Sequence, residues 1–178
     1  MMRHLTEADY RTQPWKNGRG STVELWRLER DGQLLARLSR AAVVEDGPFS
    51  VFPGMERNLT VLSGPGFRLT GAGHDFRCQP LVPVAFPGDI HLSASETDGQ
   101  QSNDFNVMTS RALPRPQVLL AQNDTLQTGG QLALYSLGPV MVCGQAMARG
   151  DLLLTNGPAV LTGDWPVLVT RFFGLPES

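Results

Sequence analysis

Glycine and proline interrupt the chain every few residues, and this limits its fold more than any other feature. The 178 residues include 19 glycines and 13 prolines, which leaves little room for long helices. Between them, apolar and polar residues alternate, as in Phe67 and Leu69 against Arg68 and Thr70. A period of two is typical of β-strands. The sequence therefore predicts an all-β sandwich or barrel, with one short helix over residues 6–10.

The chain also contains a faint internal repeat. LSGP at 62–65 is echoed by SLGP at 136–139, and each half then reaches a Gly-Asp pair, at 88–89 and 150–151. A duplicated β-unit gives this pattern, although turn dipeptides also recur by chance in β proteins. Residues 112–116 carry two prolines and are a candidate stiff linker. We expect two halves, residues 1–111 and 112–178, packed as one compact unit in which N-terminal strands can complete the smaller half.

The distribution of charge excludes several classes of function. Fourteen of the 15 basic residues are arginine, Lys16 is the one lysine, and there are three histidines. The net charge is 15 − 17 = −2, and no Lys/Arg cluster occurs, so we expect no nucleic-acid partner. No stretch approaches the ~20 apolar residues of a membrane span. The polar start lacks a signal-peptide core, so we expect a cytoplasmic protein whose two cysteines are reduced.

A repeated small β-barrel of this kind resembles the cupin fold, but without its metal ligands. With Gly64 at the end of the first cupin motif, Arg57 stands where metal-binding cupins carry a glutamate. The two histidine positions fall within residues 50–53 (SVFP), and His91 alone matches the second motif. One ligand of four does not make a metal site, so we expect no metal or other cofactor.

The arginine at this position changes the expected chemistry. A guanidinium in place of a carboxylate converts a cation site into an anion site, and the planar fork of Arg57 suits a carboxylate. The alternatives are that Arg57 forms an ion pair with Glu56 or Asp46, and that His91 is a structural strand histidine. The second half has no histidine, so it is a structural barrel or a dimerisation surface, and we expect a homodimer.

Two further segments carry candidate binding residues. In residues 14–22 (PWKNGRGST), Trp15 offers apolar area, Lys16 a charge and Asn17 an orienting amide, which suits a small-molecule clamp. The same residues are also compatible with a hairpin turn and a core tryptophan. In residues 104–108 (DFNVM), alternation places Asp104 and Asn106 on one face. Inside a barrel these two need partners or a ligand; at a solvent-facing edge they do not.

Together with residues 46–57 (DGPFSVFPGMER), these segments resemble the signatures of the HutD/Ves family. PWKNGRGST is similar to PWKNGGGTT, with Arg19 in place of a glycine, and DFNVM matches as written. The resemblance implies a metal-free bicupin, with two cupin-like β-barrels or sandwiches in one chain. It also implies a restraining role in bacterial histidine utilisation through sensing of urocanate or N-formylglutamate. It implies no catalytic activity, and its Ves branch is linked to stress response.

Three functional hypotheses follow. In the first, the protein binds a small carboxylate such as urocanate, N-formylglutamate or formate. In the second, it is a metal-independent isomerase or hydrolase that acts on a polar carboxylate; in the third, the pocket is vestigial and the protein binds a partner. In the binding hypothesis, Arg57 binds the ligand carboxylate, and Lys16 and Asn17 close the mouth of the pocket. Asp104 and Asn106 bind nitrogen or amide groups of the ligand. Trp15 or Phe105 stacks on its flat part. The enzyme hypothesis uses Glu24, His91, Asp104 and Lys16 as acid/base candidates.

Overall fold

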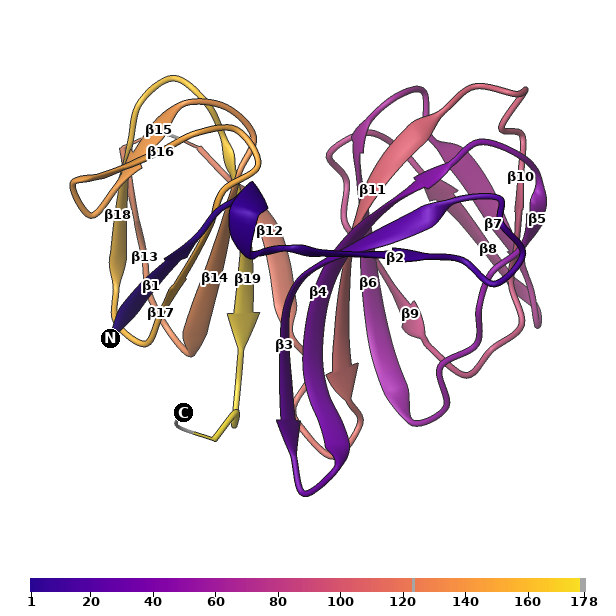
Figure 1. The fold of residues 1–178 in the computed structure, drawn as a ribbon, viewed down its shortest axis with the longest axis horizontal. Helices are drawn as coiled ribbons and strands as arrows, with labels where there is room; N and C mark the ends of the chain where they lie inside the picture. Colours follow the sequence, from indigo (N-terminus) through magenta and orange to yellow (C-terminus); the bar gives the residue numbers. More distant parts are fainter. Residues whose placement is uncertain (123, 177–178) are drawn as a thin grey trace. The chain divides into compact units, whose positions relative to one another are not determined.

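The computed structural model describes residues 1–122 and 124–176, and the regular elements in these residues are β-strands apart from one short helical turn (Figure 1). The one helix in these ranges is a 3-10 turn, η1 (Glu7–Asp9). The Thr6 backbone N–H donates to the Asp9 carboxylate at 2.9 Å at the start of this turn. The structure confirms the all-β prediction, and the short helix lies where the sequence predicts it.

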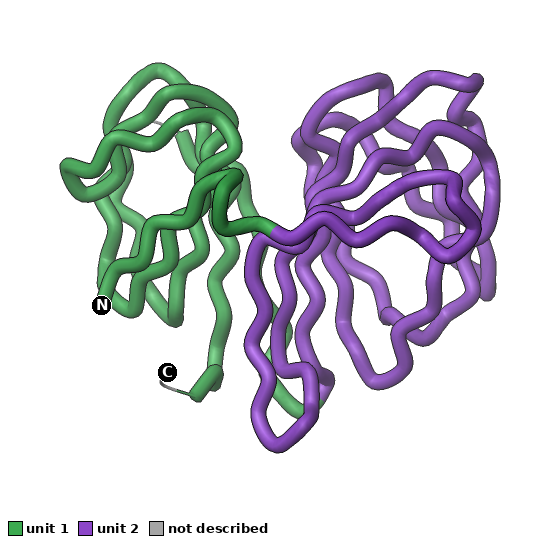
Figure 2. The backbone as a smooth tube through the Cα atoms, viewed as in Figure 1, with its two compact units in different colours: residues 1–10, 112–178 green, residues 11–111 purple. Residues whose placement is uncertain are grey.

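The strands fall into two compact units, which Figure 2 draws in different colours. The larger unit comprises Arg11–Arg111, and the smaller unit comprises Met1–Tyr10 and Ala112–Ser178. The change of unit after residue 111 coincides with the boundary drawn from the sequence. Residues 1–10, however, lie in the smaller unit, because β1 (Met2–Leu5) pairs along its whole length with β17 (Leu152–Thr155).

The larger unit contains two open sheets with an apolar core contributed by both. Its six-stranded sheet has the order β2-β3-β4-β11-β6-β9, and its four-stranded sheet has the order β5-β10-β7-β8. The core includes Leu59 and Val61 from the first sheet and Phe67, Leu69 and Ala94 from the second. The strands are β2 (Arg11–Pro14), β3 (Ser21–Arg30), β4 (Gln33–Val43), β5 (Gly47–Pro48), β6 (Met55–Ser63), β7 (Phe67–Gly71), β8 (His74–Cys78), β9 (Val84–Pro87), β10 (Ser93–Ser95) and β11 (Ser102–Ser110).

The smaller unit repeats this arrangement. Its sheets have the orders β1-β17-β14-β19-β12 and β13-β18-β15-β16. Both contribute to one core, through residues such as Leu134 and Val169 on one side and Val142 and Leu161 on the other. The strands are β12 (Gln117–Ala121), β13 (Thr125–Gln127), β14 (Gln131–Ser136), β15 (Val140–Val142), β16 (Gln145–Met147), β17, β18 (Ala159–Thr162) and β19 (Val167–Phe172).

The strand orders show how far the sequence repeat extends. β4-β11-β6-β9 corresponds to β12-β19-β14-β17, and β5-β10-β7-β8 corresponds to β13-β18-β15-β16. LSGP joins β6 to β7 and SLGP joins β14 to β15, so this part of the repeat marks equivalent turns. The Gly-Asp pairs are not equivalent, because residues 88–89 follow β9 whereas residues 150–151 precede its counterpart β17.

On one face of the six-stranded sheet, β4 and β11 carry polar side chains, whereas β6 carries apolar residues after Arg57. The candidate site lies on this face. Strand pairing sets Met108 of β11 between Arg37 of β4 and Arg57 of β6. Side chains of alternate residues share a face of the sheet. The following rows on this face are Ser39–Asn106–Leu59 and Ala41–Asp104–Val61, in the order β4, β11, β6. Polar side chains on β4 and β11 therefore lie beside the apolar core.

Candidate ligand-binding site

A cavity of about 770 Å³ lies within the larger unit. This volume is in the range of small-molecule pockets. Three parts of the chain line it: the β2–β3 loop, the segment that joins β4 to β6, and one face of β4, β6 and β11. The candidate residues that line it are Trp15, Lys16, Asn17, Arg57, Asp104 and Asn106. Six residues from three separate sequence segments therefore meet at one cavity.

Arg57 is the buried cation of this cavity. It is 6% exposed, and its Nη1 donates to the Ser50 backbone carbonyl at 3.2 Å. The guanidinium carbon lies 5.6, 5.1 and 5.2 Å from the ring centroids of Phe49, Phe52 and Phe86. Cation–π contacts of this kind offset part of the cost of burying a charge. Burial lowers the pKa of Arg57 to about 10, so the side chain keeps its charge at neutral pH.

Arg57 retains unused hydrogen-bonding capacity. A guanidinium carries five N–H groups, and the structure gives partners to two of them, through Ser50 and Asn106. Its Nε has no hydrogen-bond partner among the residues that the structure describes. The two ion pairs considered from the sequence are not formed: Glu56 accepts from Arg111 at 2.9 Å, and Asp46 accepts from Thr97.

Asn106 connects Arg57 to Asp104. Its Oδ1 accepts from Arg57 Nη2 at 2.8 Å, and its Nδ2 donates to Asp104 Oδ1 at 2.5 Å. Asp104 is 1% exposed. Burial raises its pKa to about 7, while the charge of Arg57 and hydrogen bonds from the Ala41 backbone and Asn106 oppose this rise. An acid with a pKa near neutrality thus lies one side chain away from the buried guanidinium.

A second arginine at the cavity is already neutralised. Arg37 Nε donates to the Glu24 carboxylate at 2.7 Å, and Arg37 also contacts Gln13 Oε1 at 3.4 Å. Glu24 is buried at 5% exposure and does not line the cavity, although it pairs with Ser39 on the cavity strand β4. In the structure it holds Arg37, and it also lies 3.7 Å from the more exposed Arg27. The free charge at the inner end of the cavity therefore belongs to Arg57 and Asp104.

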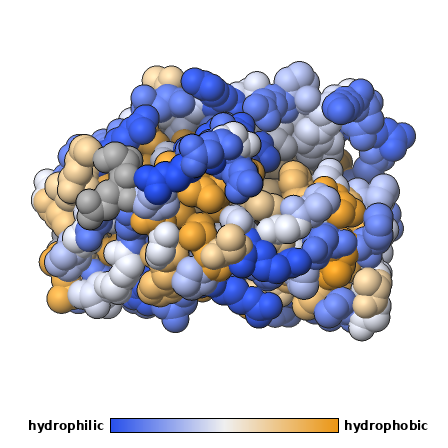
Figure 3. All heavy atoms as spheres, turned by 90° about the horizontal axis from the view of Figure 1, so that it is seen from below, coloured by the Kyte–Doolittle hydropathy of each residue, from blue (hydrophilic) through white to orange (hydrophobic). Residues whose placement is uncertain are grey.

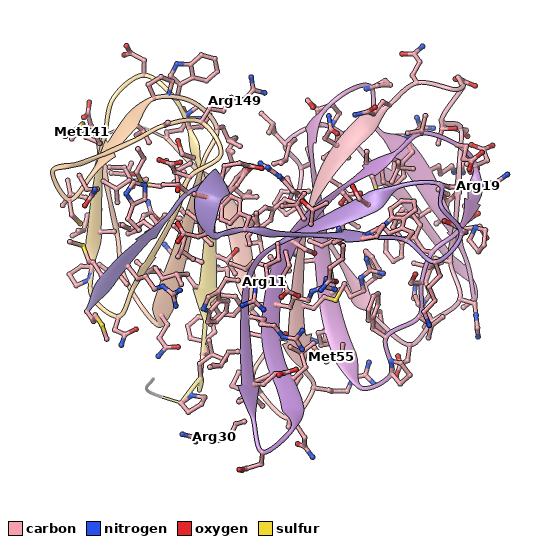
Figure 4. The ribbon with its side chains drawn as sticks, in the orientation of Figure 1. Arg11, Arg19, Arg30, Met55, Met141 and Arg149 are labelled. Atoms are coloured by element: carbon pink, nitrogen blue, oxygen red, sulfur yellow. The ribbon has the colours of Figure 1, made fainter. Side chains whose placement is uncertain are left out.

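The mouth is formed by the β2–β3 loop. The Trp15 indole N–H donates to Thr22 Oγ1 at 2.8 Å, and Asn17 Oδ1 accepts from the Arg19 backbone N–H at 3.0 Å. Asn17 therefore shapes the turn as well as lining the cavity. Arg19 projects outward from the loop (Figure 4) and lies 3.2 Å from Glu45, which also lines the cavity. Lys16 lines the same mouth and is exposed.

Besides Glu24, two residues proposed from the sequence lie outside the cavity. Phe105 is 1% exposed and does not line the cavity, because it alternates with Asp104 and Asn106 and so lies on the opposite face of β11. His91 is exposed in the connection between β9 and β10, outside the cavity, and is not in a strand. The chain turns directly after β9, and His91 follows this turn.

Four residues at the cavity were not predicted from the sequence. Arg37 and Ser39 line the cavity from β4, and Phe49 and Phe52 place their rings against Arg57. The alternation of Arg37, Ser39 and Ala41 in the sequence was a usable signal for the first two. The aromatic contacts depend on a chain reversal between β5 and β6, which no periodicity encodes.

The described residues contain no group of three or more His, Cys, Asp and Glu side chains that could hold a metal ion. Within the same residues, no helix is long and apolar enough to cross a bilayer. Hydrophobic and hydrophilic side chains both reach the surface in Figure 3. In the smaller unit, Leu126 and Val160 are paired across β13 and β18 and are 60% and 49% exposed. The dimerisation surface expected in this half stays a prediction.

Comparison with known proteins places this site in a family context. The family model described as HutD matches residues 7–164. HutD from Pseudomonas fluorescens SBW25, solved in a formate condition, is 30% identical, with a TM-score of 0.84 over 98% of this chain and 100% of that chain. A conserved protein of unknown function from Pseudomonas aeruginosa PAO1 is 28% identical, with the same TM-score and coverage.

More distant structures share the fold alone. Pirin YhhW from Escherichia coli, solved in complex with nickel(II), is 9% identical, with a TM-score of 0.68 over 98% of this chain and 100% of that chain. The repeated sandwiches and these likenesses confirm the predicted bicupin class. The sheets of this chain stay open, so each half is a sandwich of two sheets and not a closed barrel.

Proposed function

The chain belongs to the HutD family, and from that premise we propose that it is a metal-free carboxylate-binding protein that regulates bacterial histidine utilisation. The proposed ligand is urocanate or N-formylglutamate. The similarity to HutD from P. fluorescens over the whole of that chain supports the association with this pathway. The site supports the chemical class of the ligand.

The observation that carries the proposal is the state of Arg57. Its guanidinium is buried at the cavity, backed by three phenylalanine rings, and has donors left over after its contacts to Ser50 and Asn106. A buried charge whose N–H donors have no acceptor is energetically unfavourable unless a ligand accepts hydrogen bonds from them. A carboxylate matches the planar fork of arginine in both charge and geometry.

The remaining lining suits a ligand larger than a single carboxylate. Asn106 presents an amide beside Arg57, Ser39 a hydroxyl, and Trp15 an indole at the mouth. These groups can address a ring or an amide attached to the carboxylate. The volume of about 770 Å³ leaves room for ligands the size of urocanate or N-formylglutamate.

A second candidate function rests on Asp104. A buried carboxyl with a pKa of about 7 is suited to general acid–base chemistry at neutral pH. This observation favours the metal-independent enzyme that acts on a polar carboxylate. Turnover of either pathway intermediate by the wild-type protein, and its loss in Asp104→Asn, would support this candidate over a binding role.

Calorimetry with urocanate, N-formylglutamate and formate tests the binding proposal. We expect at least one of the three to bind, and Arg57→Met to reduce its affinity by at least about 30-fold, equivalent to roughly 2 kcal/mol for a charge-assisted pair. Arg77→Met is the matched control, because Arg77 lies on β8 outside the cavity with an exposed side chain. Circular dichroism establishes that both variants fold. Absence of binding by all three ligands, or equal affinity of the Arg57 variant, would refute the proposal.

A further inference from the structure

The inner end of the cavity carries a balanced set of charges. Arg37 is neutralised by Glu24 at 2.7 Å, and Arg27, which lies 3.7 Å from the same carboxylate, is itself paired with Glu29 at an exposed site. Arg57 and Asp104 are the remaining buried pair, joined through Asn106. With Asp104 ionised, the charges of these groups sum to zero. An incoming carboxylate would then give a buried net charge of −1, and one guanidinium would serve two carboxylates.

Burial makes a net charge of −1 at this site energetically unfavourable. Asp104 is 1% exposed and Arg57 is 6% exposed, so water screens their charges poorly. Two carboxylates that share a buried site do not both stay ionised, because like charges raise the pKa of one of them. Cys78 of β8 also lies close enough for the charge of Asp104 to affect it, but burial raises the pKa of that thiol to about 12, so it stays neutral.

The hydrogen bonds that Asp104 accepts, from Asn106 and from the Ala41 backbone, leave a place for a proton, because each carboxyl oxygen has two lone pairs. Asn106 Nδ2 already donates to Oδ1 of this carboxyl, and Asn106 Oδ1 is taken by Arg57. A proton on Oδ2 would therefore keep both Asn106 contacts. The other charged residues that line the cavity are Lys16, Arg19, Glu45 and Asp46. Arg19 is paired with Glu45, and Asp46 is held by Thr97, so Lys16 is the lining residue among these four for which no partner is described.

We infer that the site takes up its carboxylate ligand together with one proton, which Asp104 holds while Arg57 holds the ligand. This inference rests on the proposed function and narrows the class of ligand. The site selects a ligand that carries a carboxylate and no positively charged group. Because one proton is taken up with the carboxylate, the net charge added to the site is that of the neutral acid. A zwitterion such as an amino acid would supply its own ammonium group to Asp104 and would need no proton.

Proton uptake can be measured by calorimetry with acetate and glycine, which share a carboxylate and differ in the ammonium group. Each is titrated at pH 6 and pH 8 in two buffers with different ionisation enthalpies. With Asp104 titrating near 7, we expect acetate to take up about one proton at pH 8 and close to none at pH 6. The affinity for acetate should fall about tenfold between these pH values. At pH 6, where Asp104 already holds a proton and cannot pair with an ammonium group, glycine should bind more weakly than acetate.

The variant Asp104→Asn separates this linkage from general effects of pH. It keeps an acceptor for Asn106 Nδ2 and should bind acetate without proton uptake and with the same affinity at pH 6 and pH 8. As a second measurement, the infrared spectrum of the wild-type protein minus that of the variant should show a protonated carboxyl band that grows when acetate is added at pH 8.

The possible outcomes separate the two proposals. Acetate binding at pH 8 without proton uptake overturns the inference and leaves the carboxylate site intact. Tighter binding of glycine than acetate at pH 6, again without proton uptake, shows that Asp104 stays ionised and also overturns it. If acetate, urocanate, N-formylglutamate and formate all fail to bind at either pH, the proposed function fails, and the inference fails with it.

Discussion

Arg57 Nη2 donates a hydrogen bond to Asn106 Oδ1 at 2.8 Å, and both side chains are buried. The bond fixes the orientation of the Asn106 amide, whose nitrogen then points to Asp104. One amide thereby serves a guanidinium and a carboxyl at once. The arrangement makes Asn106 the structural link between the group proposed to bind the ligand and the group proposed to hold the proton.

Replacing Asn106 by alanine should therefore affect both stability and binding. The change leaves one donor of Arg57 and one acceptor of Asp104 without this partner, and each buried loss costs about 1–3 kcal/mol. We expect the free energy of unfolding in urea to fall by about 3 kcal/mol and carboxylate affinity to fall at least tenfold.

The control for this prediction is Asn103→Ala. Asn103 donates to Ser63 Oγ from the same strand, but it is half-buried and lies outside the cavity. We expect this variant to lose less than about 1 kcal/mol and to bind normally. Equal losses in the two variants would show that the Arg57–Asn106–Asp104 link has no special role.

The pH dependence of stability should report directly on Asp104. The folded-state pKa is raised to about 7 from the ordinary value of 3.8. Between these two pH values the folded protein holds a proton that the unfolded chain has lost, so the free energy of unfolding falls as pH rises through this window. In Asp104→Asn this contribution is absent.

We therefore expect the stability advantage of Asp104→Asn over wild type to grow between pH 4 and pH 7, by up to about 4 kcal/mol at 1.36 kcal/mol per pKa unit. Urea unfolding of both proteins at pH 4.5 and pH 8, followed by tryptophan fluorescence, measures the difference. A difference that is constant with pH would mean that Asp104 titrates at its ordinary value.

The sequence predicted much of the site because the site follows strand alternation. The DFNVM segment places Asp104 and Asn106 on one face and Phe105 on the other, and the cavity uses the first two. The assignment of Arg57 to an anion site came from its position before Gly64, and the structure places Arg57 at the cavity. The shared face of Asp104 and Asn106 follows from local periodicity, which one strand carries by itself, whereas the position of Arg57 follows from motif spacing.

The failures arise where the backbone departs from regular pairing. In β3 the register shifts between Glu24 and Trp26, so Glu24 and Leu25 are both buried although they are neighbours. Alternation could not predict that Glu24 lies behind Arg37. His91 was placed by counting along a motif, and it lies in an irregular connection. The sequence predicts that N-terminal strands can complete the smaller half, but it does not show that β1 pairs with β17, about 150 residues away.

Neutralising Glu24 should strengthen carboxylate binding. Glu24→Gln removes the charge that holds Arg37 at 2.7 Å, so a second guanidinium at the cavity becomes available to an anion. We expect the affinity for the carboxylate ligand to rise about threefold to tenfold, and stability to fall because the half-buried Arg37 loses its charged partner. Calorimetry at constant ionic strength measures the first effect.

The control is Glu29→Gln, since Glu29 pairs with Arg27 at an exposed site on the same strand. This variant should bind with wild-type affinity. Unchanged or weaker binding by Glu24→Gln would show that Arg37 does not reach the ligand even when its ion pair is broken.

Arg19 should contribute little to stability. Its side chain is 67% exposed and that of Glu45 is 58% exposed, and exposed ion pairs contribute about 0–1 kcal/mol. Arg19→Gly, which restores the glycine of the family signature, should change the free energy of unfolding by less than about 0.5 kcal/mol. Its effect should be on association, because a cation at the mouth attracts anions and salt screens that attraction. We expect the association rate of a carboxylate to depend less on salt in the variant, as measured by stopped-flow tryptophan fluorescence.

Gly64 should be among the least replaceable residues outside the cavity. Its φ is +91°, and a Cβ at this position would lie 2.3 Å from the Gln101 carbonyl oxygen and 2.7 Å from Ser102 Cα. Both neighbours are backbone atoms, so Gly64→Ala forces the β6–β7 turn away from β11. We expect a loss of about 3 kcal/mol or more in the free energy of unfolding.

Gly32 provides the matched comparison, because its φ is +75° but a Cβ there meets nothing within 4 Å. Gly32→Ala should lose only about 1 kcal/mol, the cost of the left-handed backbone alone. Because the turn at Gly64 ends the strand that carries Arg57, Gly64→Ala should also weaken carboxylate binding, whereas Gly32→Ala should not. If the two variants lost the same stability, the close approach of the β6–β7 turn to β11 would not be what requires glycine at this position.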